Sequence, residues 1–302
     1  MWPHFLSSTV TFFVQLLSLY LFEEYTDLGM AGIGMSNAIS SLVLFLILYF
    51  ILRCTSLPHP ETYRALKCSD LRNWRIFCKI AVPSFLLMIV EGWSFEISTL
   101  VIGLLGSVNL AAQGIVANIA GILWISCGFG TSMATAAIVG NAMGMKKVGL
   151  AKIVSYEMII IGLLFIGAYN LTFNFFPRSI LSIFTSEEAV IVKAERAYSA
   201  MLIGLIFDIL NWVAYGISKG IGVIGHLPIV QFVFYYMIHQ PLAIVLIFHF
   251  HFQFEAYWYI CIATLASLSL INHCVVWCKN WHKIADEIEE RGQQEKCARP
   301  VD

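Results

Sequence analysis

The stretch LMIVEGWSFEIST (87–99) places two carboxylates, Glu91 and Glu96, inside an otherwise apolar part of the chain. After Glu96, no charged residue occurs in residues 97–145. A charged side chain inside a membrane-spanning helix costs about 2.5–3.5 kcal/mol on insertion scales, so it usually faces a polar cavity and has a function. The stretch therefore predicts a membrane helix that carries functional acids.

The composition of the whole chain agrees with a membrane location. Of its 302 residues, 59% are hydrophobic and only 12% are charged, whereas soluble domains contain about 25% charged residues. The net charge of −1 gives no overall basic field, so nucleic acid is not an expected partner. The eight cysteines include no tight CxxC pair, and we expect no metal and no cofactor. We predict an all-α, multi-pass protein of the lipid bilayer.

Apolar runs of about 20 residues mark helices that can cross a bilayer. We predict about eight transmembrane helices, at 3–21, 28–53, 77–105, 109–139, 150–176, 195–217, 221–248 and 254–278. Pro83 and Pro241 fall inside two of these runs and should kink the helices or open their hydrogen-bond ladders locally.

The positions of lysine and arginine predict the orientation. If the N-terminus lies in the cytosol, most of the 18 lysines and arginines fall in cytosolic segments, as the positive-inside rule requires. The outer loops then keep Arg178, Lys193 and Arg196. Both termini are therefore expected in the cytosol, with residues 281–302 forming a short amphipathic or solvated helix that frays at its end.

Glu91 and Glu96 are expected to play different parts. Five residues separate them, which is about 140° around a helix, so both cannot point into one narrow cleft. The face of Glu91 carries Met88, Phe95 and Ser98, and the face of Glu96 carries Trp93, Leu100 and Gly103. The first strip suits contact with an organic cation and the second suits packing. We expect Glu91 to face the cavity and Glu96 to pack against a neighbouring helix.

A third acid, Asp208, lies in the predicted span 195–217. It shares its helical face with Asn211, Trp212 and Tyr215. An anion surrounded by such groups can hold an organic cation by charge pairing and cation–π contact. A structural hydrogen-bond pair between helices is the alternative for these acids. His239, two residues before Pro241, is a candidate proton group.

The motif EGWSFE (91–96) resembles the E-W-W-x-[FY]-E sequence in helix seven of eukaryotic multidrug and toxic compound extrusion (MATE) antiporters. The resemblance continues through PS (83–84), VIGLLGSVNLAAQGIV (101–116), GFGTSMATAAIVGNAMG (128–144), YGISKGIG (215–222) and YYMIHQP (235–241). The first two spans, including LGMAGIGMSNAIS (28–40), look like helices five and six of the family.

This resemblance implies site residues for coupling and for the cavity. Glu91 and Glu96 match the paired acids of helix seven, and Asp208 matches the acidic position of helix ten. Asn118 stands where some animal members have a glutamate, and His239 replaces a glycine. The substrate- and cation-coupling residues are thus expected to be Glu91, Glu96 and Asp208, and the cavity-lining residues Phe95, Asn118, Asn211, Trp212, Tyr215 and His239.

The resemblance also implies the domain organisation. Residues 1–53 correspond to a remnant of the N-terminal bundle, with its last two helices. Residues 54–76 form a cytosolic linker, residues 77–280 a complete C-terminal six-helix bundle, and residues 281–302 the cytosolic tail. Helices one to four of the family have no counterpart. We expect either a truncated gene model or a shortened paralogue that assembles with a partner chain.

The expected function is secondary active export of small organic compounds, cationic ones foremost, in exchange for H⁺ or Na⁺ at the plasma membrane or a vacuolar membrane. The alternative is a truncated, non-transporting MATE-like protein with a regulatory or scaffolding role. An upstream in-frame extension encoding four more spans would count against that alternative. An enzyme is not expected, because no H-x-x-H or H-x-x-x-H pair is present to support a di-metal centre.

Overall fold

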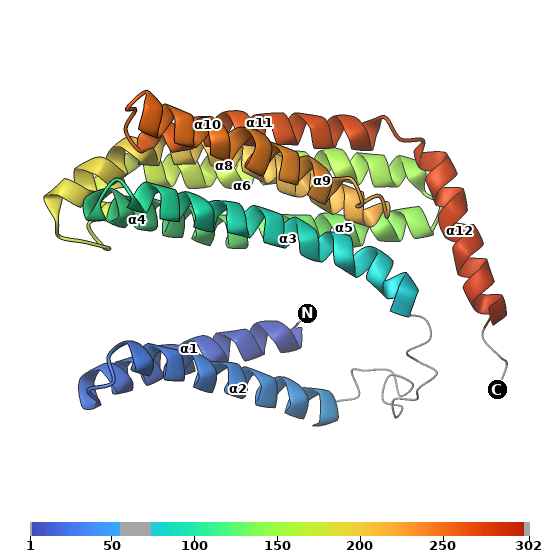
Figure 1. Cartoon of the computed structure of the whole chain (residues 1–302). Helices are drawn as coiled ribbons and strands as arrows, with labels where there is room; N and C mark the ends of the chain where they lie inside the picture. The colour runs from blue at the N-terminus through green and yellow to red at the C-terminus, as the bar shows by residue number, and fades with distance from the viewer. Residues whose placement is uncertain (1, 55–73, 299–302) are drawn as a thin grey trace. The chain divides into compact units, whose positions relative to one another are not determined.

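The computed structural model describes residues 2–54 and 74–298, which are helical apart from short connections (Figure 1). The chain divides into two compact units, Met1–Asn73 and Trp74–Asp302. Most of the expected linker (54–76) lies outside the described residues, and so do residues 299–302 of the expected tail.

The first unit is a hairpin of two long helices. They are α1 (Trp2–Tyr25) and α2 (Met30–Cys54), which run antiparallel beside each other (Figure 1). A polar seam joins them, in which the hydroxyl groups of Ser18 and Ser36 lie 2.6 Å apart and the Gln15 amide donates to Asn37 Oδ1 over 3.0 Å. Such hydrogen bonds between helices hold a hairpin together where hydrophobic burial from water is absent.

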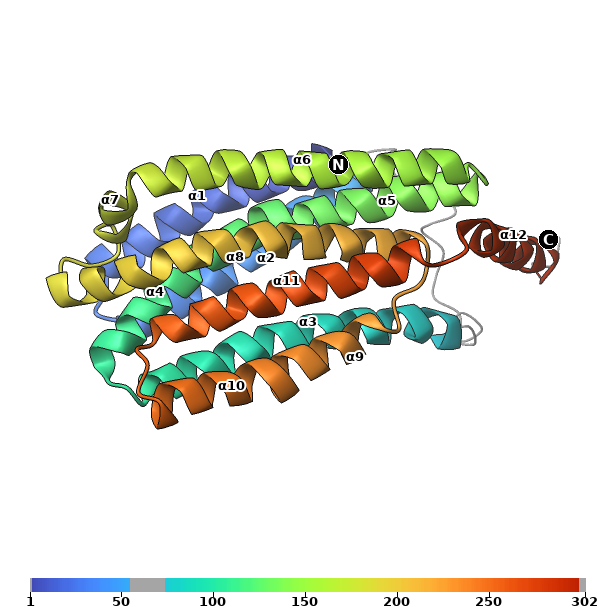
Figure 2. The same cartoon turned by 90° about the horizontal axis from the view of Figure 1, so that it is seen from above.

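The second unit is a helical bundle capped at one end by a helix that crosses it (Figures 1 and 2). Its helices in chain order are α3 (Trp74–Gly103), α4 (Ser107–Leu123), α5 (Gly130–Gly144), α6 (Val148–Phe175), α7 (Pro177–Leu181), α8 (Glu188–Gly220), α9 (Leu227–Phe232), α10 (Gln240–Ile244), α11 (Glu255–Trp277) and α12 (Trp281–Ala298). A π-helical segment, Trp124–Phe129, joins α4 to α5, so the two form one long span.

Helix α8 is the central element of this bundle. It packs against α4, α5, α6 and α11, and 78% of the residues in its most apolar stretch are buried. Its closest approach is to α5, where an added Cβ at Gly216 would lie 2.5 Å from the carbonyl oxygen of Ser132. Glycine therefore allows the two backbones to touch, as small residues do in membrane bundles.

The segment around Pro241 departs from α-helical geometry. Two π-helical segments, Val233–His239 and Val245–His249, lie on either side of α10. Proline supplies no backbone N–H and its ring obstructs the preceding turn, and such irregular turns are a common response. The expected local opening of the hydrogen-bond ladder at Pro241 is thus present.

Helix α12 docks on α5 and α6 at the end of the bundle. Trp281 is buried and stacks on Trp277 at 5.4 Å between ring centroids. Lys146 pairs with Asp286 at 3.2 Å and also with Glu289, and these hydrogen bonds raise the pKa of the Lys146 ammonium. The pairs are exposed, so each contributes little to stability, and the buried indole is the main anchor of α12.

Eight helices of the described residues are long and apolar enough to cross a membrane: Pro3–Tyr25, Met30–Cys54, Phe77–Gly103, Ser107–Gly144, Val148–Phe175, Glu188–Gly220, Leu227–His249 and Glu255–Trp277. Each overlaps one predicted span. The prediction of an all-α, multi-pass membrane protein is confirmed.

Candidate functional site

Glu91 lies in a chain of buried side chains that crosses the second unit. Its Oε2 accepts a 2.9 Å hydrogen bond from Nε2 of Gln231, and the same nitrogen lies 2.5 Å from the hydroxyl oxygen of Tyr215. Asn211 donates to that hydroxyl over 2.5 Å, and Asn272 donates to Asn211 Oδ1 over 2.8 Å. We call these five residues the polar cluster. They come from α3, α8, α9 and α11.

The polar cluster is sealed within the second unit. Glu91 is only 1% exposed, and the other four side chains are fully buried. Lys219 near the end of α8 acts on Glu91 electrostatically. Among the described residues, Oε1 of Glu91 has no hydrogen-bond partner. Nε1 of Trp124, which also lacks a partner among these residues, lies near enough to this carboxyl group to stabilise its charge.

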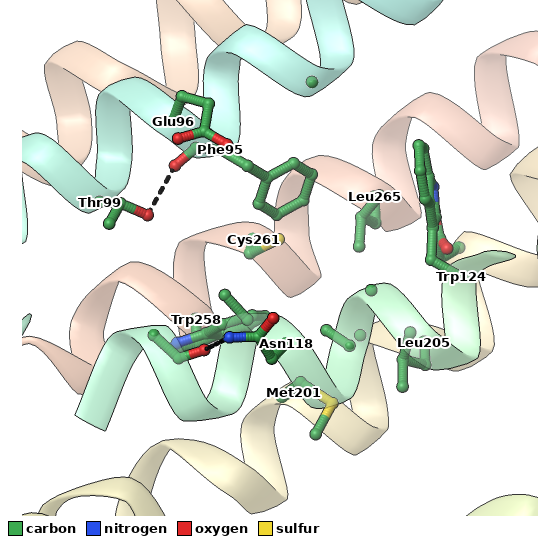
Figure 3. A pocket seen from close by; sticks show the side chains of 17 residues that line it. Phe95, Glu96, Thr99, Asn118, Trp124, Met201, Leu205, Trp258, Cys261 and Leu265 are labelled. Atoms are coloured by element: carbon green, nitrogen blue, oxygen red, sulfur yellow. Dashed lines mark hydrogen bonds between the residues drawn. The ribbon is translucent and has the colours of Figure 1, made fainter. Parts of the chain in front are cut away.

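A pocket of about 400 Å³ lies between α3, α4, α8 and α11 (Figure 3). Its wall carries two carboxyl groups, Glu96 from α3 and Asp208 from α8, and no lysine or arginine. Its lining residues are Gly92, Phe95, Glu96, Thr99, Gly114, Ala117, Asn118, Ala120, Gly121, Trp124, Met201, Gly204, Leu205, Asp208, Trp258, Cys261 and Leu265. Figure 3 shows the ring of Phe95 pointing from α3 toward Cys261 and Leu265 on α11.

Asp208 connects the pocket with the polar cluster. It lines the pocket and is 6% exposed, and it lies within electrostatic reach of Glu91. Two carboxyl groups that repel one another in a low-dielectric interior cannot both hold a full negative charge cheaply. A cation in the pocket and a proton on this pair can therefore influence one another.

The expected placement of Glu91 and Glu96 is wrong. Glu96 lines the pocket and is exposed, and among the described residues its carboxyl group makes no hydrogen bond or ion pair. Its face-mates Trp93 and Leu100 are 63% and 73% exposed, so this face of α3 does not pack within the second unit. Glu91 lies instead on the face of α3 that meets α9. The two carboxyl groups are thus placed the other way round from the expectation, although Phe95, on the same predicted face as Glu91, also lines the pocket.

Other predicted cavity residues divide in the same way. Phe95 and Asn118 line the pocket, whereas Asn211, Trp212, Tyr215 and His239 are not part of its wall. Asp208 and the turns of α8 before it line the pocket, whereas the turns after it are buried against other helices. His239 is fully buried, with Nδ1 3.1 Å from Thr264 Oγ1. A part for these four residues in a transport cavity stays a prediction.

Two groups of site residues escaped prediction. Gln231 and Asn272 are single amides within apolar runs, a signal that could have found them. Trp124 and Trp258 also line the pocket, but a tryptophan in an apolar helix has no pattern that distinguishes it from a lipid-facing one. Within residues 2–54 and 74–298, no group of three or more His, Cys, Asp or Glu side chains is placed to hold a metal ion.

The second unit is similar in sequence to a known protein family. A family model described as MatE matches residues 83–245, more than half of the chain. The chain belongs to the MatE family. The matched range contains Glu91, Glu96 and Asp208 and begins and ends inside membrane-spanning helices of the second unit.

Eukaryotic relatives extend the MatE similarity to nearly the whole chain. Multidrug and toxin extrusion protein 2 from Oryctolagus cuniculus is 30% identical over 298 residues, covering 96% of this chain and 48% of the rabbit protein. Multidrug and toxin extrusion protein 1 from Homo sapiens is 29% identical over 257 residues, covering 85% of this chain and 45% of the human protein. The chain spans about half the length of these relatives.

Solved structures share the MatE fold. The crystal structure of the eukaryotic MATE transporter AtDTX14 matches with a TM-score of 0.85 and 20% sequence identity, over 95% of this chain and 64% of that one. The inward-facing conformation of a multidrug resistance MATE family transporter matches with a TM-score of 0.70 and 13% identity, over 94% of this chain and 64% of that one.

Proposed function

We propose that the chain acts in secondary active export of organic cations in exchange for H⁺ or Na⁺. The observation that carries the proposal is the wall of the pocket, where Glu96 and Asp208 stand with the rings of Phe95, Trp124 and Trp258 and with no basic side chain. Carboxylates attract a cation, and aromatic faces stabilise it by cation–π contact, most strongly where water is excluded. A volume of about 400 Å³ lies within the range of small-molecule sites.

Asp208 provides the coupling between the two ions. A substrate cation held by Asp208 favours its charged form, whereas a proton or Na⁺ that neutralises Asp208 or Glu91 removes the attraction for the substrate. Because such coupling is reciprocal, each ion weakens the binding of the other. Exchange requires that the substrate and the coupling ion displace one another, and competition at Asp208 would meet that requirement.

The names of the relatives, multidrug and toxin extrusion proteins, support the export of small organic compounds, and the positive charge of the substrate rests on the pocket. The basic residues of the chain support an orientation with both termini in the cytosol. The membrane we propose is the plasma membrane or a vacuolar membrane. Because the chain spans about half the length of these relatives, transport by this chain is itself part of the proposal.

A binding experiment tests the pocket. The full chain in lipid nanodiscs is titrated with ethidium, a fluorescent aromatic cation, at several pH values and with NaCl or KCl at constant ionic strength. Asp208→Asn should weaken ethidium binding about tenfold, because one buried attraction of roughly 1.4 kcal/mol is lost. It should also remove most of the competition by protons or Na⁺. Thr99→Val, which alters the wall without altering charge, is the matched control. Unchanged affinity in Asp208→Asn would exclude the proposed site.

A flux experiment tests exchange. Vesicles containing the full chain are loaded with ethidium, and efflux is followed after an imposed pH gradient or Na⁺ gradient. Acceleration by one gradient identifies the coupling ion. Binding without acceleration by either gradient would contradict export by this chain.

A further inference from the structure

The indole of Trp258 is held from outside the pocket by a side chain of another helix. Trp258 on α11 lines the pocket, and its Nε1–H donates a 2.9 Å hydrogen bond to Oε1 of Gln113 on α4. Gln113 is fully buried and does not belong to the pocket wall. The contact therefore joins the wall to a residue that the substrate does not touch.

The indole of Trp258 also has an aromatic neighbour. The ring of Tyr257 meets Trp258 edge to face, with 5.6 Å between centroids, and Tyr257 meets His239 in the same way at 4.8 Å. A tryptophan side chain has two rotatable bonds and several low-energy orientations. An edge-to-face contact restricts the ring, but only the directional hydrogen bond to Gln113 selects the orientation in which Nε1 points at α4.

This orientation determines how much room the pocket has. The α4 side of the pocket is built from small residues, Gly114, Ala117 and Gly121, which leave space that no side chain fills. Trp258, Cys261 and Leu265 lie at i, i+3 and i+7 and form the face of α11 that lines the pocket. Trp258 is the largest member of that face, so the plane of its indole limits the shape of the cavity.

Gln113 also has an unusual hydrogen-bond balance. Among the described residues, its Nε2 has no partner, although the amide is fully buried. A leucine or methionine of similar length would avoid the desolvation of that amide. What glutamine supplies that these residues do not is a hydrogen-bond acceptor at the indole nitrogen.

We propose that Gln113 is a positioning residue that sets the orientation of the Trp258 indole and thereby selects flat aromatic cations over bulky aliphatic ones. The selectivity rests on the proposed function of the pocket, whereas the positioning does not. Gln113 touches no substrate and acts only through Trp258.

The positioning is tested by ¹⁹F NMR of the full chain labelled with 5-fluorotryptophan in detergent micelles. The chain has eight tryptophans, and the signal of Trp258 is the one that disappears in Trp258→Phe. We expect that signal to shift or split in Gln113→Met, which removes the acceptor at nearly constant volume. Gln113→Asn withdraws the acceptor by one methylene and should move the same signal if the methionine variant fails to fold. An unchanged Trp258 signal in a folded variant would overturn the positioning role.

The selectivity is tested with ethidium and tetrapropylammonium, each titrated into the same variants. Gln113→Met should weaken ethidium binding roughly threefold to tenfold and leave tetrapropylammonium binding nearly unchanged. In a Trp258→Phe background, which has no indole N–H, Gln113→Met should have no further effect. An equal loss of ethidium affinity in both backgrounds would show that Gln113 acts by another route. Absence of ethidium binding in the wild type, with the NMR shift present, would overturn the proposed function and the selectivity but not the positioning.

Discussion

Glu91 and Glu96 belong to the same helix, five residues apart, and occupy opposite environments. Glu91 is 1% exposed and hydrogen-bonded to Gln231, whereas Glu96 is exposed on the wall of the pocket. The first carboxyl group is held by the fold, and the second is free to meet a ligand. The difference teaches that a paired motif can contain one acid whose loss affects the interior and one whose loss affects only binding.

The largest effect is expected from removing the amide that holds Glu91. Gln231→Leu leaves the carboxyl group of Glu91 and the hydroxyl of Tyr215 without that donor, and it should lower the free energy of unfolding by about 2–3 kcal/mol. Unfolding in detergent, followed by circular dichroism, measures the change. Gln253→Leu is the matched control, because its hydrogen bonds are exposed and its loss should change stability by less than about 0.5 kcal/mol. Equal stability of Gln231→Leu and wild type would show that the fold does not depend on the hydrogen bond to Glu91.

Glu96 should show the reverse pattern. Glu96→Gln is expected to leave the free energy of unfolding within about 0.5 kcal/mol of wild type. It should weaken ethidium binding by roughly threefold to tenfold, because an attraction at an accessible site is lost. Titration and unfolding of the same preparation provide both values. A large fall in stability would restore the interpretation of Glu96 as a packing residue.

A smaller change in affinity is expected at Glu91, since its carboxyl group does not line the pocket. Glu91→Gln should change ethidium affinity at pH 7.5 by less than about threefold, but flatten its dependence on pH. Among the described residues, the charged groups within reach of Glu91 are Asp208 and Lys219, so each binding curve is repeated in Asp208→Asn. A normal pH response in Glu91→Gln would leave Asp208 as the titrating member of the pair.

The smallest effect is expected on the pH dependence of stability, from His226, which lies between two spans. Its contribution must be separated from any pH response of the acids. Burial and the nearby charge of Lys279 lower the pKa of His226 below its ordinary value. The unfolded chain therefore binds the proton first as pH falls, and the stability present above the ordinary pKa decreases below it. Wild type should unfold slightly more easily at pH 5.5 than at pH 7.5, and His226→Asn should reduce that difference. An identical pH slope in both proteins would assign the response to other groups.

The spans were predictable because a bilayer demands apolar length, and that demand is visible in any window of the sequence. Which face of each helix meets which neighbour was harder to predict. Helical geometry separates Glu91 from Glu96 by about 140°, but it carries no information on which neighbour covers which face. Gln231, which is 140 residues away along the chain, decides that Glu91 is the enclosed one. Likewise, the pocket is lined by Asp208 and by the turns of α8 that precede it, whereas the predicted face-mates that follow Asp208 are buried against other helices.

The π-helical segment Trp124–Phe129 has a consequence for how the chain tolerates change in length. Such a segment contains about one residue more than an α-helix would use for the same rise, and the surplus is absorbed locally. Deleting one residue there would return the backbone to α geometry while α4 and α5 keep their registers against α8. The same deletion in the middle of α8 would rotate every later residue by about 100°. The span that carries Trp124 at the pocket thus has a built-in site for loss of a residue, and α8 has none.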